Sequence, residues 1–111
     1  MSSSIFVQSS PVSTEVEDEF DHWYDTVHIP QVVARVAGVA RGTRFVESPV
    51  SAEAPVEDGV RRRLTVYELE DDDVLGAMRS LMEAMGDGSL DTSPLIDREI
   101  RPPQISAWRT P

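Results

Sequence analysis

Hydrophobic and polar positions follow two different periods along the chain, and each change of period marks a new element. Short runs rich in β-branched and aromatic residues predict strands at 5–8, 39–47, 60–70 and 105–108. Apolar residues spaced three and four apart predict helices at about 14–29 and 74–85. The order β-α-β-β-α-β predicts a ferredoxin-like α+β fold, an antiparallel sheet with two helices on one face. We expect a single domain over residues 1–111.

Acidic residues, glycines and prolines set the expected limits of these elements. Acidic side chains fill the first turn of the first helix and precede the second at 71–73, where they favour a helix N-terminus. Pro30 disfavours helical backbone just before it, so we expect a break or kink there and a further turn ending near Gly38. Residues 48–59 show no periodicity and predict a long hairpin loop.

The predicted strands carry apolar side chains on both faces of the sheet. Ile5 and Val7 point opposite to Phe6, and Leu64 points opposite to Tyr67. Because two helices cover only one face, we expect the other face to meet a partner sheet or a ligand. A chain of this length also buries only about 65% of its unfolded surface. Both arguments favour a homodimer.

Composition excludes several classes of function. The chain has 20 acidic and 10 basic residues, for a net charge of -10, so nucleic acid and anionic membranes are not expected partners. It contains neither Lys nor Cys, which excludes Schiff-base and thiol chemistry on its side chains. No spacing matches a metal site, and we expect neither metal nor cofactor. Without a membrane-length apolar run or a signal-like N-terminus, we expect a cytoplasmic protein.

The first helix and the strand after it carry a recognisable pattern. It comprises Trp23-Tyr24, His28-Ile29-Pro30, Gly38-Val39 and Arg44-Phe45. This pattern resembles the dimeric α+β barrel superfamily, most closely its EthD-like branch. The resemblance implies two paired ferredoxin-like sheets and a pocket between sheet and helices in each subunit. The superfamily includes polyketide cyclases and muconolactone isomerases, which implies a small hydrophobic or aromatic ligand. This chain has no His outside the first helix, so relatives that need one elsewhere have no counterpart here.

His28 and Tyr24 are the candidate catalytic pair. They are four residues apart and share one helical face if the helix continues that far. A His tuned near neutrality could move a proton beside a carbonyl, and a Tyr hydroxyl could polarise that carbonyl. Asp25, or Asp21 further back, could orient the imidazole. Alternatively, His28 caps the helix end and Tyr24 belongs to the core.

Aromatic and arginine side chains are the candidates for substrate binding, and each also has a structural explanation. Aromatic rings build a core or form the walls of a pocket for a flat ligand. A strand arginine either points inward, toward a carboxylate or enolate, or forms surface ion pairs. His22 has Asp18 and Asp25 as expected surface partners, and the methionines of the second helix are expected in the core. The binding candidates are Phe20, Trp23, Arg44, Arg62, Tyr67 and Trp108.

Three functions fit these residues. The first is a cofactor-independent enzyme of the cyclase or isomerase kind, acting on a small hydrophobic carbonyl compound through His28 and Tyr24. The second is a non-catalytic small-molecule-binding or assembly protein of the same fold. The third is a monooxygenase, either cofactor-free or with haem held by His28.

Overall fold

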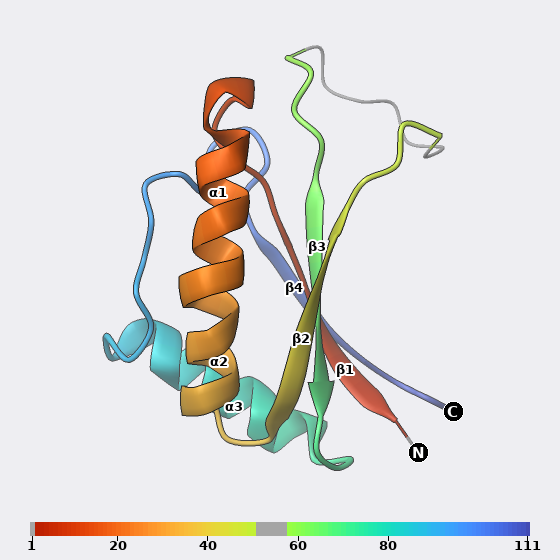
Figure 1. The fold of residues 1–111 in the computed structure, drawn as a ribbon. Coiled ribbons are helices and arrows are strands. Elements are labelled where there is room, and N and C mark those ends of the chain that lie inside the picture. Colours follow the sequence, from red (N-terminus) through yellow and green to blue (C-terminus); the bar gives the residue numbers. More distant parts are fainter. Residues whose placement is uncertain (1, 51–57) are drawn as a thin grey trace.

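Four antiparallel strands form one sheet in the order β2-β3-β1-β4. Figure 1 shows the computed structural model, which describes residues 2–50 and 58–111. Val7 in the centre of β1 lies opposite Thr65 of β3 and Ile105 of β4. The predicted ferredoxin-like α+β architecture is confirmed, while residues 51–57 of the expected hairpin loop lie outside the described residues. The strands are β1 (Ser3–Ser9), β2 (Val39–Val46), β3 (Arg63–Leu69) and β4 (Gln104–Arg109).

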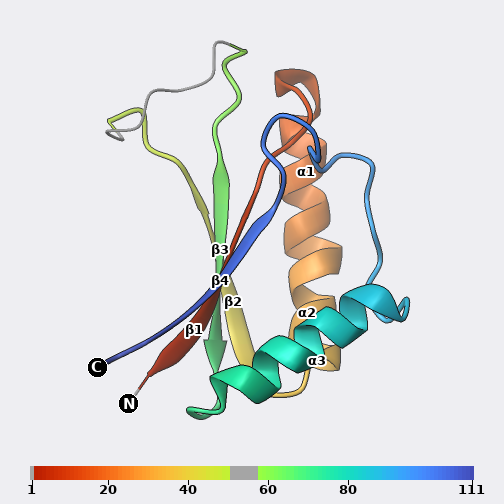
Figure 2. The same cartoon turned by 180° about the vertical axis from the view of Figure 1, so that it is seen from behind.

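The helices cover one face of this sheet. Figures 1 and 2 show η1, α1, η2 and α2 stacked end to end along the sheet, with α3 crossing below them. None of the helices in the described ranges is long and apolar enough to span a membrane. The helical elements are η1 (Thr14–Val16), α1 (Glu17–Trp23), η2 (Tyr24–His28), α2 (Ile29–Arg35) and α3 (Val74–Gly86).

The break expected at Pro30 does not occur, because a π-helical turn takes its place. In η2 the backbone N–H of Ile29 donates to the carbonyl of Tyr24, five residues back. Pro30 then stands in the first turn of α2, where a missing N–H is tolerated. The hydroxyl of Thr26 donates to the carbonyl of His22 at 2.7 Å, which satisfies an acceptor inside the helical segment. Tyr24 and His28 therefore lie on one continuous helical segment.

The ends of α2 and α3 follow the sequence prediction. Gly38, just after α2, has a φ of +91°, a conformation that glycine adopts without strain. The carboxylate of Asp73 accepts from the backbone N–H of Gly76 at 2.9 Å and so caps α3. Both boundaries thus come from local sequence signals.

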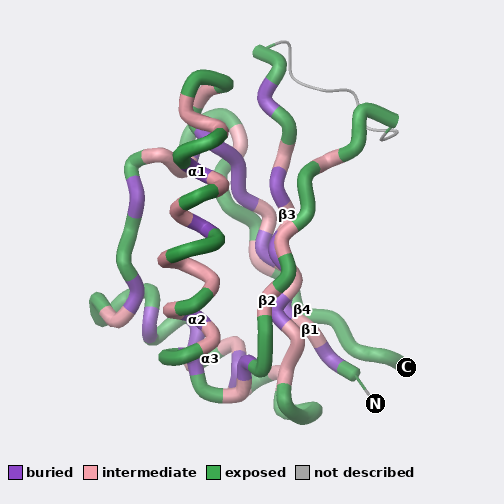
Figure 3. Tube along the Cα trace, in the orientation of Figure 1, coloured by how far each residue is buried: buried purple, intermediate pink, exposed green. Residues whose placement is uncertain are grey.

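The core lies between the helices and the inner face of the sheet. Buried positions alternate along β1 and β3 (Figure 3), and Ile5, Val32 and Tyr67 are almost completely buried. The prediction that the α3 methionines belong to the core holds for Met78 alone. Met82 and Met85 are each about half exposed, at 52% and 49%.

The opposite face of the sheet is open and carries large apolar side chains. Phe6 contacts Trp108 with ring centroids 5.8 Å apart. Phe45 and Trp108 are 50% and 59% exposed. The expectation of apolar side chains on both faces is therefore confirmed, and no helix of residues 2–50 and 58–111 covers this face.

Residues 87–103, the α3–β4 connection, return the chain along the helix-covered side of the sheet. A short bridge pairs Pro11 with Ile96, and the N–H of Asp97 donates to the carbonyl of Ser10 at 2.8 Å. The buried Asp97 carboxylate accepts three backbone N–H groups, which come from Glu99, Ile100 and Arg101. These bonds hold the connection in place without a helix or strand of its own.

Gly42 of β2 offers a test of how tightly the sheet packs. A Cβ at this position would lie 2.9 Å from ring carbons of Tyr67 and 3.0 Å from Cγ2 of Ile29. We expect Gly42→Ala to lower the free energy of unfolding by about 1–3 kcal/mol in chemical denaturation. Gly86→Ala is the matched control, since no atom lies within 4 Å of a Cβ there, and it should lose nothing. Equal stability of the two variants would show that the Tyr67 ring moves aside freely.

Candidate functional site

A cavity of about 260 Å³ lies beneath the helical segment, between the sheet, α3 and the α3–β4 connection. Most of its wall is apolar, which suits a ligand that is mainly hydrophobic. Its volume is below the range of about 300–1,000 Å³ typical of pockets for drug-sized ligands. The site therefore fits a small molecule. It is lined by Val7, Trp23, Tyr24, His28, Tyr67, Leu81, Met85, Leu90, Asp91, Thr92, Ile96, Arg98, Pro103 and Ile105.

His28 brings an unpartnered imidazole to this cavity. Trp23 stacks on the imidazole at 4.9 Å between centroids, and the edge of Tyr24 lies 4.8 Å away. The Nδ1 atom is buried and has no hydrogen-bond partner in the described part of the chain. Burial lowers the pKa of His28 to about 4. The side chain is therefore neutral at pH 7, and its place within the helical segment differs from the expected helix cap.

Tyr24 is a buried hydroxyl paired with β1. Its Oη lies 2.6 Å from Oγ of Ser9, and Phe20 packs beneath its ring with centroids 4.8 Å apart. Burial raises the pKa of Tyr24, while the bond to Ser9 and the positive charge of Arg98 lower it in part. Two hydroxyls hold two protons and one mutual bond uses only one, so this pair keeps a proton to donate.

Tyr67 supplies a second unpartnered polar atom. Its hydroxyl is buried and finds no hydrogen-bond partner among residues 2–50 and 58–111. Burial raises the pKa of Tyr67 well above its usual range, so the hydroxyl keeps its proton. Leaving a buried polar group unpaired costs about 1–3 kcal/mol. The hydroxyl of Tyr67 and Nδ1 of His28 are thus two unpaired polar atoms on residues that line the cavity.

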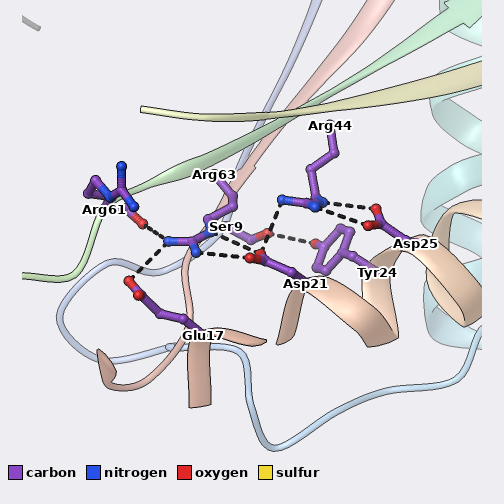
Figure 4. Close-up of polar contacts among 8 residues, drawn as sticks. All are labelled: Ser9, Glu17, Asp21, Tyr24, Asp25, Arg44, Arg61 and Arg63. Carbon is purple, nitrogen blue, oxygen red and sulfur yellow. Dashed lines mark hydrogen bonds and ion pairs between the residues drawn. The ribbon is translucent and has the colours of Figure 1, made fainter. Parts of the chain in front are cut away.

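Asp25 and Asp21 bind arginines, and in the described residues neither is hydrogen-bonded to the imidazole. Arg44 donates to both carboxylate oxygens of Asp25 at 3.0 Å and to Asp21 at 3.1 Å (Figure 4). This pairing with Arg44 lowers the pKa of Asp25. Arg63, only 3% exposed, donates to both oxygens of Asp21 at 3.1 and 3.2 Å. The two aspartates therefore fasten the helical segment to β2 and β3.

The remaining binding candidates divide between this cavity and other places. Trp23 and Tyr67 line the cavity, whereas Phe20 lies in the core below Tyr24. Arg62 pairs with Glu47, and the arginine that points inward to the helices is its neighbour Arg63. Trp108 lies beside Phe6 on the open face.

Sequence reasoning missed the residues that the α3–β4 connection contributes. Leu90, Ile96 and Arg98 come from this stretch, which has no periodic pattern to place it. Met85 was assigned to the core but lies at the cavity. Within the described residues, no group of three His, Asp or Glu side chains is placed to hold a metal ion.

The comparisons with known proteins concern the fold. No protein-family model matches the chain, and no curated protein matches it. An ethyl tert-butyl ether D (EthD) family protein from Bacillus halodurans matches over 99% of both chains, with a TM-score of 0.52 and 14% identity. The chain has an EthD-like fold. An EthD-like protein from Ralstonia eutropha matches 96% of this chain and 92% of its own, with a TM-score of 0.45 and 18% identity. The Bacillus halodurans match, at 14% identity, establishes the fold alone.

The buried imidazole predicts a pH-dependent stability. The pKa of His28 is about 4 in the folded state, against about 6.5 in an unfolded chain. Between these values the unfolded state binds more protons, so the free energy of unfolding falls as the pH drops from 6.5 to 4, by at most about 3 kcal/mol. In urea denaturation across this range, His28→Gln should lose less stability than wild type. His22→Gln, at the exposed His, should follow wild type; identical curves for all three would contradict the burial of His28.

Proposed function

We propose that this protein is a cofactor-independent enzyme that moves a proton on a small hydrophobic carbonyl compound, with His28 as the acid/base. The observation that carries the proposal is the pairing of a neutral, unpartnered imidazole with an unpartnered hydroxyl in one mainly apolar cavity. General acid–base catalysis needs a proton acceptor within reach of the substrate and a donor for the oxygen on which charge develops.

The proposed reaction is an isomerisation through an enolate. Neutral His28 removes a proton from the carbon beside the carbonyl, and the electron pair moves onto the carbonyl oxygen. The hydroxyls of Tyr67 and Tyr24 donate to that oxygen, since Tyr67 has no other partner in the described residues and the Tyr24–Ser9 pair has a spare proton. In a substrate with a carbon–carbon double bond next to the deprotonated carbon, the enolate is a dienolate, and the imidazolium returns the proton to its far carbon, which moves the double bond into conjugation with the carbonyl. Asp25 contributes by holding the helical segment through Arg44.

A second candidate, a non-catalytic binding protein, is favoured by the low pKa of His28. A base whose pKa is about 4 accepts a proton from carbon poorly, because catalytic bases work best when their pKa is near the working pH. A nearby enolate would raise this pKa by stabilising the imidazolium. The two candidates thus differ in whether the ligand forms a negative charge beside His28. The haem-dependent monooxygenase receives less support, because the cavity is small for a porphyrin.

Deuterium exchange tests the enzyme directly. When the protein is added to a panel of small apolar ketones in D₂O, deuterium should replace hydrogen on the carbon beside the carbonyl. NMR measures the rate of this exchange. His28→Gln should slow this exchange by at least about 100-fold, and His22→Gln should not. If ketones shift the NMR signals of the His28 ring but exchange no hydrogen for deuterium, the enzyme proposal is overturned and the binding protein is favoured. If no ketone shifts these signals or exchanges, both candidates fall.

The open face of the sheet supports a homodimer as the working unit. Phe6, Phe45 and Trp108 present apolar surface there that a second sheet would cover. We expect a dimer by light scattering at micromolar concentration, and Phe45→Asp should shift it toward the monomer. Glu99→Gln, which alters an exposed residue of the α3–β4 connection, should leave the dimer intact. A monomeric wild type would contradict this part of the proposal.

A further inference from the structure

Among the described residues that line the cavity, Arg98 is the one arginine. It belongs to the α3–β4 connection, and its Nη1 donates to the carbonyls of Ser93 at 3.1 Å and Ile96 at 3.3 Å. These two bonds fix one nitrogen of the guanidinium. In the described ranges, Nε and Nη2 have no hydrogen-bond partner, so the group can still accept a ligand through two donors.

Within the described residues Arg98 has no carboxylate partner, a feature that it shares with Arg35, Arg61, Arg79 and Arg109. Arg41, Arg44, Arg62, Arg63 and Arg101 each pair with Asp or Glu. For Arg98, no carboxylate oxygen of the residues that the structure describes lies within 4.0 Å.

The nearest acidic residue in sequence is occupied elsewhere. The carboxylate of Asp97 accepts the backbone N–H groups of Glu99, Ile100 and Arg101, and it faces the Arg101 guanidinium at 3.6 Å. These bonds turn Asp97 away from Arg98 and also hold the connection that carries Arg98. Among the arginines of the described residues, Arg98 is the one that lines this cavity, and its Nε and Nη2 can contact an anion there.

Arg98 is exposed, but it lines the cavity and its positive charge reaches Tyr24. It lowers the pKa of the Tyr24 hydroxyl, against the larger effect of burial. Tyr24 lines the same cavity and contacts His28, so a group bound to Arg98 would share the cavity with the proposed catalytic residues.

We propose that Arg98 binds a carboxylate of the ligand, and that the substrate class is a small, mainly apolar oxo-carboxylic acid. The ligand carboxylate meets Nε and Nη2 of Arg98, its hydrocarbon body lies against Leu81 and Ile105, and its oxo group reaches His28 and Tyr67. Asp91, the other charged residue of the lining, repels a carboxylate and so disfavours the reverse orientation. This inference rests on the proposed function, because it assigns the substrate of the same cavity.

A matched pair of probes tests it on the 111-residue chain. 5-Oxohexanoate and its methyl ester differ only in charge and a methyl group, and the NMR signals of the His28 ring report occupancy for both. We expect wild type to bind the acid at least about tenfold more tightly than the ester. Arg98→Gln should abolish this preference, whereas Arg79→Gln, at an exposed arginine outside the cavity, should keep it.

A second variant and a salt titration show whether Arg98→Gln acts by removing the charge or by disturbing the fold. Arg98→Lys keeps the charge, so part of the preference for the acid should return, and rising ionic strength should weaken it. Equal affinity of wild type for acid and ester would overturn the inference while leaving the proposed function intact, since both would still shift His28. If neither probe nor any ketone of the panel shifts His28, the proposed function fails as well.

Discussion

The buried ion pair between Arg63 and Asp21 is the constraint on which the rest of the structure depends. Arg63 is 3% exposed at the start of β3, and both oxygens of Asp21 accept from its guanidinium. A buried charge without its partner destabilises a fold by about 3–5 kcal/mol, so α1 has little freedom to slide or rotate over the sheet. Arg44 extends the same contact to Asp25 one turn further along. Because Tyr24 lies between these two aspartates in sequence, its position at the cavity is set by the ion pairs around it.

The π-helical turn transmits this constraint to His28. A break at Pro30 would have let the chain change direction after Val27 and separate the imidazole from Tyr24. The turn instead takes up one extra residue, and the helical segment continues to Arg35. Such turns are rare and occur often at functional sites. Here it brings the imidazole into contact with the rings of Trp23 and Tyr24, where water has little access and the pKa falls.

The sequence predicts those features of the fold and site that depend on local patterns. Periodicity locates every strand and helix, and the four-residue spacing of Tyr24 and His28 brings their rings together. Alternation along the predicted strand 60–70 indicates that Arg62 and Arg63 point to opposite faces of the sheet. It does not indicate which of the two faces the helices. That choice depends on Asp21, a residue far away in sequence. The path of the α3–β4 connection depends on equally distant partners, such as Ser10 for Asp97, so Arg98 has no local signal that places it at the cavity.

The charges around the cavity connect the proposed binding of a carboxylate with the proposed proton transfer. Burial keeps His28 neutral and both tyrosines protonated, so the site has a proton acceptor and proton donors but little driving force for proton transfer. A ligand carboxylate at Arg98 would neutralise the one fixed positive charge in the lining and bring no charge to His28 itself. Negative charge would then develop at the oxo group only as the proton leaves, where the imidazolium and the hydroxyls stabilise it. Under the proposed function, this arrangement would favour the transition state over the bound substrate, which is the condition for catalysis.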